Sequence, residues 1–171
     1  MSALVKLYYK IRRKPAPPFA EHPLWLLLWK PVRKFLNVVV IPSVPYNCVR
    51  IGLYRLIGFR IGRHVFIGMR CYLDDMDPGK TVIEDNVTVS YGCFFAIHGI
   101  HQEHTSIVIR EGAYIGMRAN ILSGKTGITV GRGSIIGAGA LVRESTPDFS
   151  TCVGVPARVI KIGSEEDQEP Q

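Results

Sequence analysis

Three histidines and a glutamate lie close together in the segment IHGIHQEH at positions 97–104. His98, His101 and His104 recur at every third position, and Glu103 directly precedes the last of them. An imidazole can accept a proton near neutral pH and return it to a leaving group, so this cluster holds a candidate general base. Imidazoles are also common metal ligands, so a bound metal ion is the alternative interpretation.

This segment interrupts a six-residue repeat of apolar side chains that follows residue 60. The spacing fits neither the period of an α-helix nor the alternation of a strand. Period six with three turns to a coil predicts coils of about 18 residues, each built of three short parallel strands and stacked on the next. The repeated positions are Ile61, Ile67 and Leu73, then Ile83, Val89 and Phe95, then Ile109, Ile115 and Ile121, and finally Val130, Ile136 and Val142.

A second break in the repeat, SGKTG at 123–127, is expected to bulge at a corner of the coil. The surrounding letters ANILSGKT also fit a loose phosphate-loop pattern. Such a loop binds phosphate only where a helix begins directly after it. Here more of the six-residue repeat follows, so we do not expect a nucleoside triphosphate site.

The repeat and two local motifs resemble the hexapeptide-repeat acyltransferases. IHGIHQEH resembles the histidine loop of galactoside and maltose O-acetyltransferases, and GVPARVIK at 154–161 resembles the closing motif of the family. IREGAYIG and VGRGSIIGAGALV resemble repeats of serine acetyltransferases. The resemblance covers about residues 50–162. It implies an all-β, left-handed parallel β-helix with a short helical N-terminal extension, assembled as a homotrimer that uses acetyl-CoA without a metal.

The resemblance also implies roles for individual residues. His98 falls on the catalytic base, while Asp75, His101 and Glu103 fall on positions that bind the acceptor or orient the base. The positions that match contacts to acetyl-CoA are Met117, Ala138, Arg143, Arg158 and Lys161.

Three departures from the family make the acceptor harder to predict. No asparagine stands in 66–70, where the galactoside enzymes have one that binds the acceptor. Serine acetyltransferases have histidine where Asp75 stands, which argues against serine as the acceptor. Glu144 replaces a lysine that is usual near the cofactor phosphates, so one phosphate contact is expected to be lost or moved.

The N-terminal part of the chain differs from the repeat in composition and charge. Residues 1–60 hold eleven of the 21 Lys and Arg and a single acid, Glu21, and every Gly lies at or after Gly52. We expect three parts: a basic, amphipathic and largely helical segment at 1–48, the β-helix domain at 49–162, and an acidic, disordered tail at 163–171.

The positive charge of residues 1–48 suggests a negatively charged binding partner. Trp25 and Trp29 share one helix face beside Lys and Arg, which is the composition of a helix lying at a membrane surface. The alternative is a helical cap on the domain or on a neighbouring subunit. No stretch is long and apolar enough to be expected to span a membrane, and no signal peptide is expected. Four scattered cysteines indicate a reduced, cytoplasmic protein, with possible peripheral contact at the inner face of the membrane.

The sequence therefore predicts an acetyl-CoA-dependent O-acetyltransferase that modifies a sugar hydroxyl in surface polysaccharide or glycolipid synthesis. One alternative is N-acetylation of an amino-sugar nucleotide on the same fold. A second is a metal site like that of the γ-carbonic anhydrases, although their ligands come from separate turns and two subunits. A third is a non-catalytic scaffold.

Overall fold

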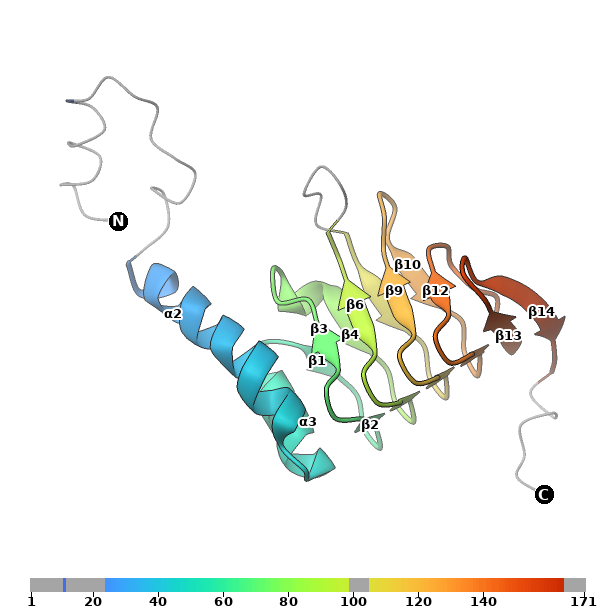
Figure 1. The fold of residues 1–171 in the computed structure, drawn as a ribbon, viewed down its shortest axis with the longest axis horizontal. Helices are drawn as coiled ribbons and strands as arrows, with labels where there is room; N and C mark the ends of the chain where they lie inside the picture. The colour runs from blue at the N-terminus through green and yellow to red at the C-terminus, as the bar shows by residue number, and fades with distance from the viewer. Residues whose placement is uncertain (1–10, 12–23, 99–104, 165–171) are drawn as a thin grey trace. The chain divides into compact units, whose positions relative to one another are not determined.

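The computed structural model of the chain describes residue 11, residues 24–98 and residues 105–164 (Figure 1). The chain divides into two compact units, Met1–Leu36 and Asn37–Gln171. Helix α2 (Leu24–Phe35) forms the described part of the first unit apart from Ile11 and Leu36. Of the segment 1–48 that was expected to be largely helical, residues 1–10 and 12–23 lie outside the described residues. No described helix has the length and hydropathy to cross a membrane.

The second unit begins with a helical section and continues as a coil of short strands. The helical section comprises η2 (Leu36–Val40, a π-helix that begins one residue before this unit), η3 (Ile41–Ser43) and α3 (Asn47–Leu56). The strands are β1 (Arg60–Ile61), β2 (Phe66–Ile67), β3 (Tyr72–Leu73), β4 (Thr81–Ile83), β5 (Thr88–Val89), β6 (Phe94–Ala96), β7 (Ile107–Ile109), β8 (Tyr114–Ile115), β9 (Asn120–Leu122), β10 (Ile128–Val130), β11 (Ile135–Ile136), β12 (Leu141–Val142), β13 (Ser150–Val153) and β14 (Arg158–Ile162). A short 3₁₀ turn, η4 (Pro78–Lys80), precedes β4.

Consecutive strands belong to three different sheets, so the chain winds as a triangular coil. Face A has the order β1-β4-β7-β10, face B the order β14-β13-β11-β8-β5-β2, and face C the order β12-β9-β6-β3. All pairings are parallel except that of β13 with β14, which closes the C-terminal end. This architecture confirms the predicted coil of three short parallel strands per turn.

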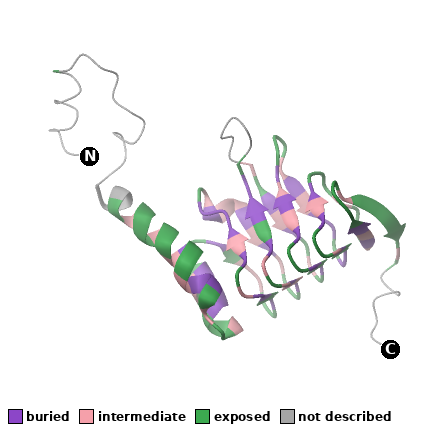
Figure 2. Ribbon diagram, in the orientation of Figure 1, coloured by how far each residue is buried: buried purple, intermediate pink, exposed green. Residues whose placement is uncertain are grey.

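The six-residue repeat forms the inner rows of the coil. Ile67 pairs with Val89 and Val89 with Ile115 on face B, while Leu73 pairs with Phe95 on face C. These side chains are fully buried, and Figure 2 shows buried residues alternating along the strands with residues of intermediate or full exposure. Each coil therefore rests its apolar side chains on those of the next, which is the main source of hydrophobic stabilisation in a solenoid.

The breaks in the repeat all fall at one edge of the coil, where face C turns into face A. The connections there are 74–80, 97–106 and 123–127, whereas the other two corners are crossed by four residues each. The last long connection, 143–149, leaves face C at the same edge but leads past face A to β13 of face B. We call this edge the insertion corner. The predicted bulge at 123–127 lies here, and strand β10 follows it rather than a helix. The structure thus confirms that this segment is a corner of the coil.

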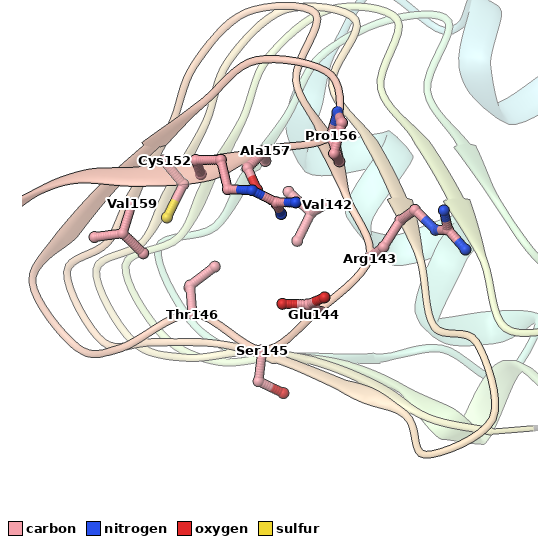
Figure 3. Close-up of a pocket in the computed structure, with 10 residues that line it drawn as sticks. Val142, Arg143, Glu144, Ser145, Thr146, Cys152, Pro156, Ala157 and Val159 are labelled. Atoms are coloured by element: carbon pink, nitrogen blue, oxygen red, sulfur yellow. The ribbon is translucent and has the colours of Figure 1, made fainter.

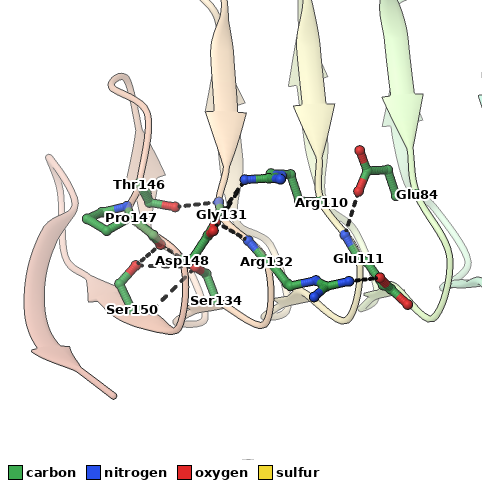
Figure 4. A network of polar contacts seen from close by, with 10 residues as sticks. All are labelled: Glu84, Arg110, Glu111, Gly131, Arg132, Ser134, Thr146, Pro147, Asp148 and Ser150. Carbon is green, nitrogen blue, oxygen red and sulfur yellow. Dashed lines mark hydrogen bonds and ion pairs between the residues drawn. The ribbon is translucent and has the colours of Figure 1, made fainter. Parts of the chain in front are cut away.

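The corner between faces A and B is held by a ladder of polar contacts (Figure 4). The Asp148 carboxylate accepts a hydrogen bond from the Arg132 backbone N–H at 2.7 Å and pairs with Arg110 at 3.3 Å. The Glu111 backbone N–H donates to Glu84 at 2.9 Å, and the Glu111 side chain pairs with Arg132. These ion pairs are half-exposed, so each adds little to stability.

Helix α3 covers the open N-terminal end of the coil. Arg50 is only 2% exposed, and its guanidinium donates to the Ile67 carbonyl at 2.6 and 2.9 Å and to the Pro45 carbonyl at 3.0 Å. The Tyr54 hydroxyl donates to the Cys71 carbonyl at 3.2 Å, and burial raises the pKa of this phenol. The buried charge is tolerated because carbonyl oxygens at the free strand edge satisfy its donors. All four cysteines are free thiols, three of them buried.

A matched pair of glycine substitutions tests the stacking of the coils. A Cβ at Gly116 would lie 2.6 Å from the Ala138 backbone nitrogen and 2.7 Å from the Ile136 carbonyl oxygen, and these backbone atoms cannot yield. We expect Gly116→Ala to destabilise the fold by about 1–3 kcal/mol. Gly52, inside α3, has nothing within 4 Å of that position. We expect Gly52→Ala to stabilise it by about 0.4–1 kcal/mol.

Thermal denaturation of both variants beside the parent protein provides the measurement. An unchanged unfolding temperature for Gly116→Ala would contradict the close approach of adjacent coils between β8 of face B and β9 of face C.

Candidate active site at the insertion corner

His98 lies at the insertion corner because it follows the end of strand β6 by two residues. β6 ends at Ala96, and the fully buried Ile97 anchors the backbone before the chain leaves the coil. β6 lies between β3 and β9 in face C. The His98 side chain is 42% exposed, so one side of the imidazole is open to solvent and the other faces protein. This is the placement that a catalytic imidazole requires.

The partner of His98 is Asp74, which follows β3 on the preceding coil. The His98 Nδ1 atom forms a hydrogen bond with Asp74 Oδ2. The same Oδ2 accepts from the Ile97 backbone N–H at 3.1 Å, and Oδ1 accepts from the Met76 backbone N–H at 3.1 Å. The Asp74 side chain is 0% exposed. Its carboxylate is therefore buried but has a donor for each oxygen.

This pairing fixes which nitrogen of His98 can do chemistry. A carboxylate accepts hydrogen bonds only, so Nδ1 carries the proton and Nε2 is left as the free acceptor. A carboxylate behind an imidazole holds the ring in that tautomer and stabilises the imidazolium that forms when Nε2 takes a proton. Chemically, this arrangement can serve as a general-base dyad in which Nε2 is the reactive nitrogen.

Analysis of the sequence missed Asp74 and selected its neighbour. Asp75 is also buried, at 4% exposed, but the hydrogen bond to His98 Nδ1 comes from the carboxylate of Asp74. A signal for Asp74 was available in the repeat: Leu73 and Phe95 share one phase, so the residues that follow them must lie side by side on adjacent coils. Asp75 keeps its predicted role at the acceptor side as a proposal. His101 and Glu103 lie outside the described residues.

The next coil forms the other wall beside His98. The Thr105 hydroxyl donates to the Ile97 carbonyl at 3.1 Å, contacts the Ser123 hydroxyl, and lies 3.0 Å from the Gly124 carbonyl oxygen. The Ser123 backbone N–H donates to the Ala96 carbonyl at 3.0 Å. The segment SGKTG is thus fastened to both ends of the histidine loop, and it places the exposed Lys125 on the same corner.

Two of the predicted cofactor residues lie at the opposite edge of face C. Met117 precedes β9 and Ala138 precedes β12, and the Gly139 N–H donates to the Met117 carbonyl at 2.8 Å. Both side chains are exposed. His98 follows its own strand of face C, at the insertion corner. Within one chain, face C therefore separates this pair from the dyad.

The remaining predicted cofactor residues lie near the C-terminal end of the coil. Arg143 and Arg158 line one pocket of about 310 Å³, shown in Figure 3. Its apolar wall includes Val142 and Val159, and the acidic Glu144 also lines it. Lys161 lines a separate, smaller hollow of about 70 Å³ beside Phe149. The structure thus brings the two arginines together but not all three basic residues.

The alternative metal site finds no geometric support among the described residues, because no group of three potential ligand side chains occurs among them. His98 is occupied by Asp74 through Nδ1. His101 and His104 lie outside the described part of the chain.

Comparison with known proteins relates the coil to acetyltransferases. No family model matches the chain. It is 41% identical over 106 residues to the serine acetyltransferase of Bacillus subtilis, a match covering 60% of this chain and 45% of that protein. It is 27% identical over 144 residues to YvoF of the same organism, named only as an acetyltransferase, with 82% and 81% covered. The chain spans less than half the length of the serine acetyltransferases that it matches.

Solved structures share the fold. The Vibrio cholerae hexapeptide-repeat acetyltransferase VCA0836, crystallised with acetyl-CoA, superimposes with a TM-score of 0.68 at 20% identity, covering 96% of this chain and all of that one. A galactoside acetyltransferase in complex with coenzyme A gives a TM-score of 0.61 at 23% identity, with 84% and 83% covered. The repeat, the three-faced parallel coil and these likenesses show that the chain has the left-handed parallel β-helix fold of the hexapeptide-repeat acetyltransferases, the proteins to which it is similar.

Proposed function

We propose that the protein transfers an acetyl group from acetyl-CoA to a hydroxyl group, with His98 as general base and Asp74 behind it. The observation that carries this proposal is the hydrogen bond between His98 Nδ1 and the fully buried Asp74 carboxylate. A buried carboxylate with each oxygen hydrogen-bonded and aimed at a half-exposed imidazole is the arrangement of a catalytic dyad. Its place at the insertion corner of an acyltransferase fold supports the same function.

The mechanism follows from the free Nε2 atom of His98. An acceptor hydroxyl within hydrogen-bond reach gives its proton to Nε2 as its oxygen attacks the carbonyl carbon of the thioester. The tetrahedral intermediate then collapses, the carbon–sulfur bond breaks, and the proton passes from Nε2 to the departing thiolate of coenzyme A. Asp74 stabilises the imidazolium between the two proton transfers. No metal takes part in this sequence.

We propose that acetyl-CoA is held at the C-terminal side of the dyad. Arg143 and Arg158 supply positive charge for phosphate groups, and Val142 and Val159 supply an apolar wall. These residues fit a nucleotide end of the cofactor, with Glu144 as the one opposing charge. Met117 and Ala138 would contact the pantetheine arm, and Lys161 would act from a neighbouring hollow.

We propose that the site is completed in a homotrimer. Met117 and Ala138 lie across face C from the dyad of their own chain, so a second copy would be needed to bring such residues against His98. Large apolar side chains are exposed along faces B and C and the corner between them, and a subunit contact would cover them. They are Phe66, Tyr91, Phe94, Tyr114, Met117 and Ile135.

We propose a sugar hydroxyl in surface polysaccharide or glycolipid synthesis as the acceptor, with Asp75, His101 and Glu103 on the acceptor side. Several curated relatives are serine acetyltransferases. Against serine stands the buried Asp75, which replaces the histidine of the serine enzymes. Transfer to an amine of a nucleotide sugar is the remaining alternative. Mild alkali separates the two products, because an ester is hydrolysed and an amide persists.

We propose that the N-terminal segment, residues 1–45, holds the enzyme peripherally at the inner, anionic face of a membrane. On α2, Leu28, Val32 and Phe35 are 66%, 49% and 59% exposed. They lie within a single arc of the helix at about 100° per residue, and Lys30 and Lys34 lie toward the opposite face. Residues 1–36 carry eight Lys and Arg against one acid. An apolar stripe opposite cationic side chains is the pattern of an interfacial helix.

Substitution of the dyad tests the mechanism. We expect His98→Asn to abolish acetyl transfer and Asp74→Asn to lower kcat by about 10²–10⁴-fold, because an amide can present a donor to Nδ1 and hold the wrong tautomer. Release of coenzyme A, followed with a thiol reagent in the presence of candidate sugars, gives the rate. Asp77→Asn is the matched control, since Asp77 is an exposed acid of the same connection. Equal activity of Asp74→Asn and Asp77→Asn would refute the dyad.

A second set of variants tests membrane contact. We expect the triple variant Leu28→Ser, Val32→Ser, Phe35→Ser to lose most of its binding to vesicles that contain phosphatidylglycerol, measured by co-sedimentation. Leu56→Ser serves as control, because Leu56 is equally exposed, at 72%, but lies on α3. Binding should also fall with Lys30→Gln, Lys34→Gln and with added salt. Undiminished binding by the triple variant would exclude α2 as the contact surface.

A further inference from the structure

Asn37 is a buried polar residue that contacts the backbone next to the catalytic carboxylate. It lies in the π-helix η2, 36 residues before Leu73, and is 0% exposed. Its Nδ2 atom donates to the Leu73 carbonyl oxygen at 2.7 Å. Its Oδ1 atom is buried without a hydrogen-bond partner among the described residues. Folding therefore buries the whole side-chain amide of Asn37 and forms one hydrogen bond through its Nδ2 atom. The unsatisfied Oδ1 atom opposes folding.

The contact occupies a special place in the sheet. β3 is the edge strand of face C, since no coil precedes it. On its inner side, the Asp74 backbone N–H donates to the Phe95 carbonyl at 3.0 Å, as between any two coils. On its outer side, the Leu73 carbonyl lacks the strand that would donate to it. The Asn37 side chain takes the place of that missing amide.

The consequence reaches the dyad within one residue. Leu73 is followed directly by Asp74, whose carboxylate must hold its orientation toward His98 Nδ1 and the Ile97 N–H. Asn37 and Phe95 fix the two sides of this strand end. A frayed edge strand would let the carboxylate turn or withdraw, and catalytic geometry is sensitive to shifts of about 1 Å. Irregular π-helical turns are frequent where a helix serves a functional site.

We infer that Asn37 is a positioning residue: through Leu73 it holds Asp74 in place behind His98. This inference rests on the proposed function of the dyad. It gives the N-terminal helical section a role in the reaction, because the residue that secures the catalytic edge strand belongs to that section and not to the coil.

The chain supplies a matched control in Asn47. It also lies in the helical section and also secures an edge strand, donating from Nδ2 to the Val65 carbonyl at 2.9 Å and accepting from the Ile67 N–H at 3.0 Å. That strand is β2 of face B, which carries no part of the dyad. A purely structural role would make Asn37→Leu and Asn47→Leu equivalent, whereas a positioning role would separate them.

The experiment combines a spectroscopic and a kinetic reading of the full-length protein. The Nδ1 proton of His98, hydrogen-bonded to a buried carboxylate, is expected to give a downfield proton resonance that Asp74→Asn identifies by removing it. We expect Asn37→Leu to shift or broaden this resonance and to lower kcat about tenfold or more, with the KM for acetyl-CoA within about twofold of the parent value. Asn47→Leu should leave the resonance and kcat unchanged at a comparable loss of thermal stability.

Two outcomes would overturn the inference: an unchanged resonance in a folded Asn37 variant, or equal changes in the Asn37 and Asn47 variants. If Asn37→Leu fails to fold, Asn37→Ala, which removes the amide without adding bulk, is judged by the same two criteria. The spectroscopic measurement needs no substrate. A parent protein without acetyl transfer activity would therefore contradict the proposed function, while the resonance would still decide the role of Asn37.

Discussion

The in-register stacking of the coils is the constraint on which the rest of the structure depends. Each apolar position of the repeat lies on the same position of the next coil, as Leu73 on Phe95 and Phe95 on Ile121. Because these strands are only two or three residues long, their register also fixes the positions of the residues at their ends. The residue after one strand must therefore meet the residues after its neighbours. Asp74, His98 and the turn at Ser123 become adjacent for this reason, although more than twenty residues separate each from the next.

The coil also explains where the site could form. Two of its three corners are short and uniform, and polar ladders such as that around Asp148 occupy one of them. The longer connections all begin where a strand of face C ends, and the inserted residues there leave the inner rows undisturbed. The scaffold supplies rigidity through its core, and the insertions supply chemistry at one edge. Such a division is common where functional residues sit on loops of a rigid fold.

Much of this fold could be predicted from the sequence, and some of the site could not. The repeat from Ile61 to Val142 predicted the strands, their parallel pairing and the register, because burial enforces a single period. The interruption at 97–104 located His98. Asp74 was missed because the resemblance pointed to Asp75. A buried aspartate at a corner also has the same hydropathy as a solvent-exposed one, so the sequence pattern does not distinguish them. Asn37 could not be foreseen at all, since its role arises from an edge strand that exists only once the coil has formed. Helix α2 was expected, but which of its side chains are exposed required the structure.

The most direct measurement is a calorimetric titration of acetyl-CoA into the purified full-length protein, with desulfo-CoA as a comparison. The donor proposed for this site must bind at micromolar concentrations with one site per chain, and desulfo-CoA should compete for that site. A folded protein that binds neither molecule would contradict the proposed transfer reaction, because His98 and Asp74 would then have no thioester to act on.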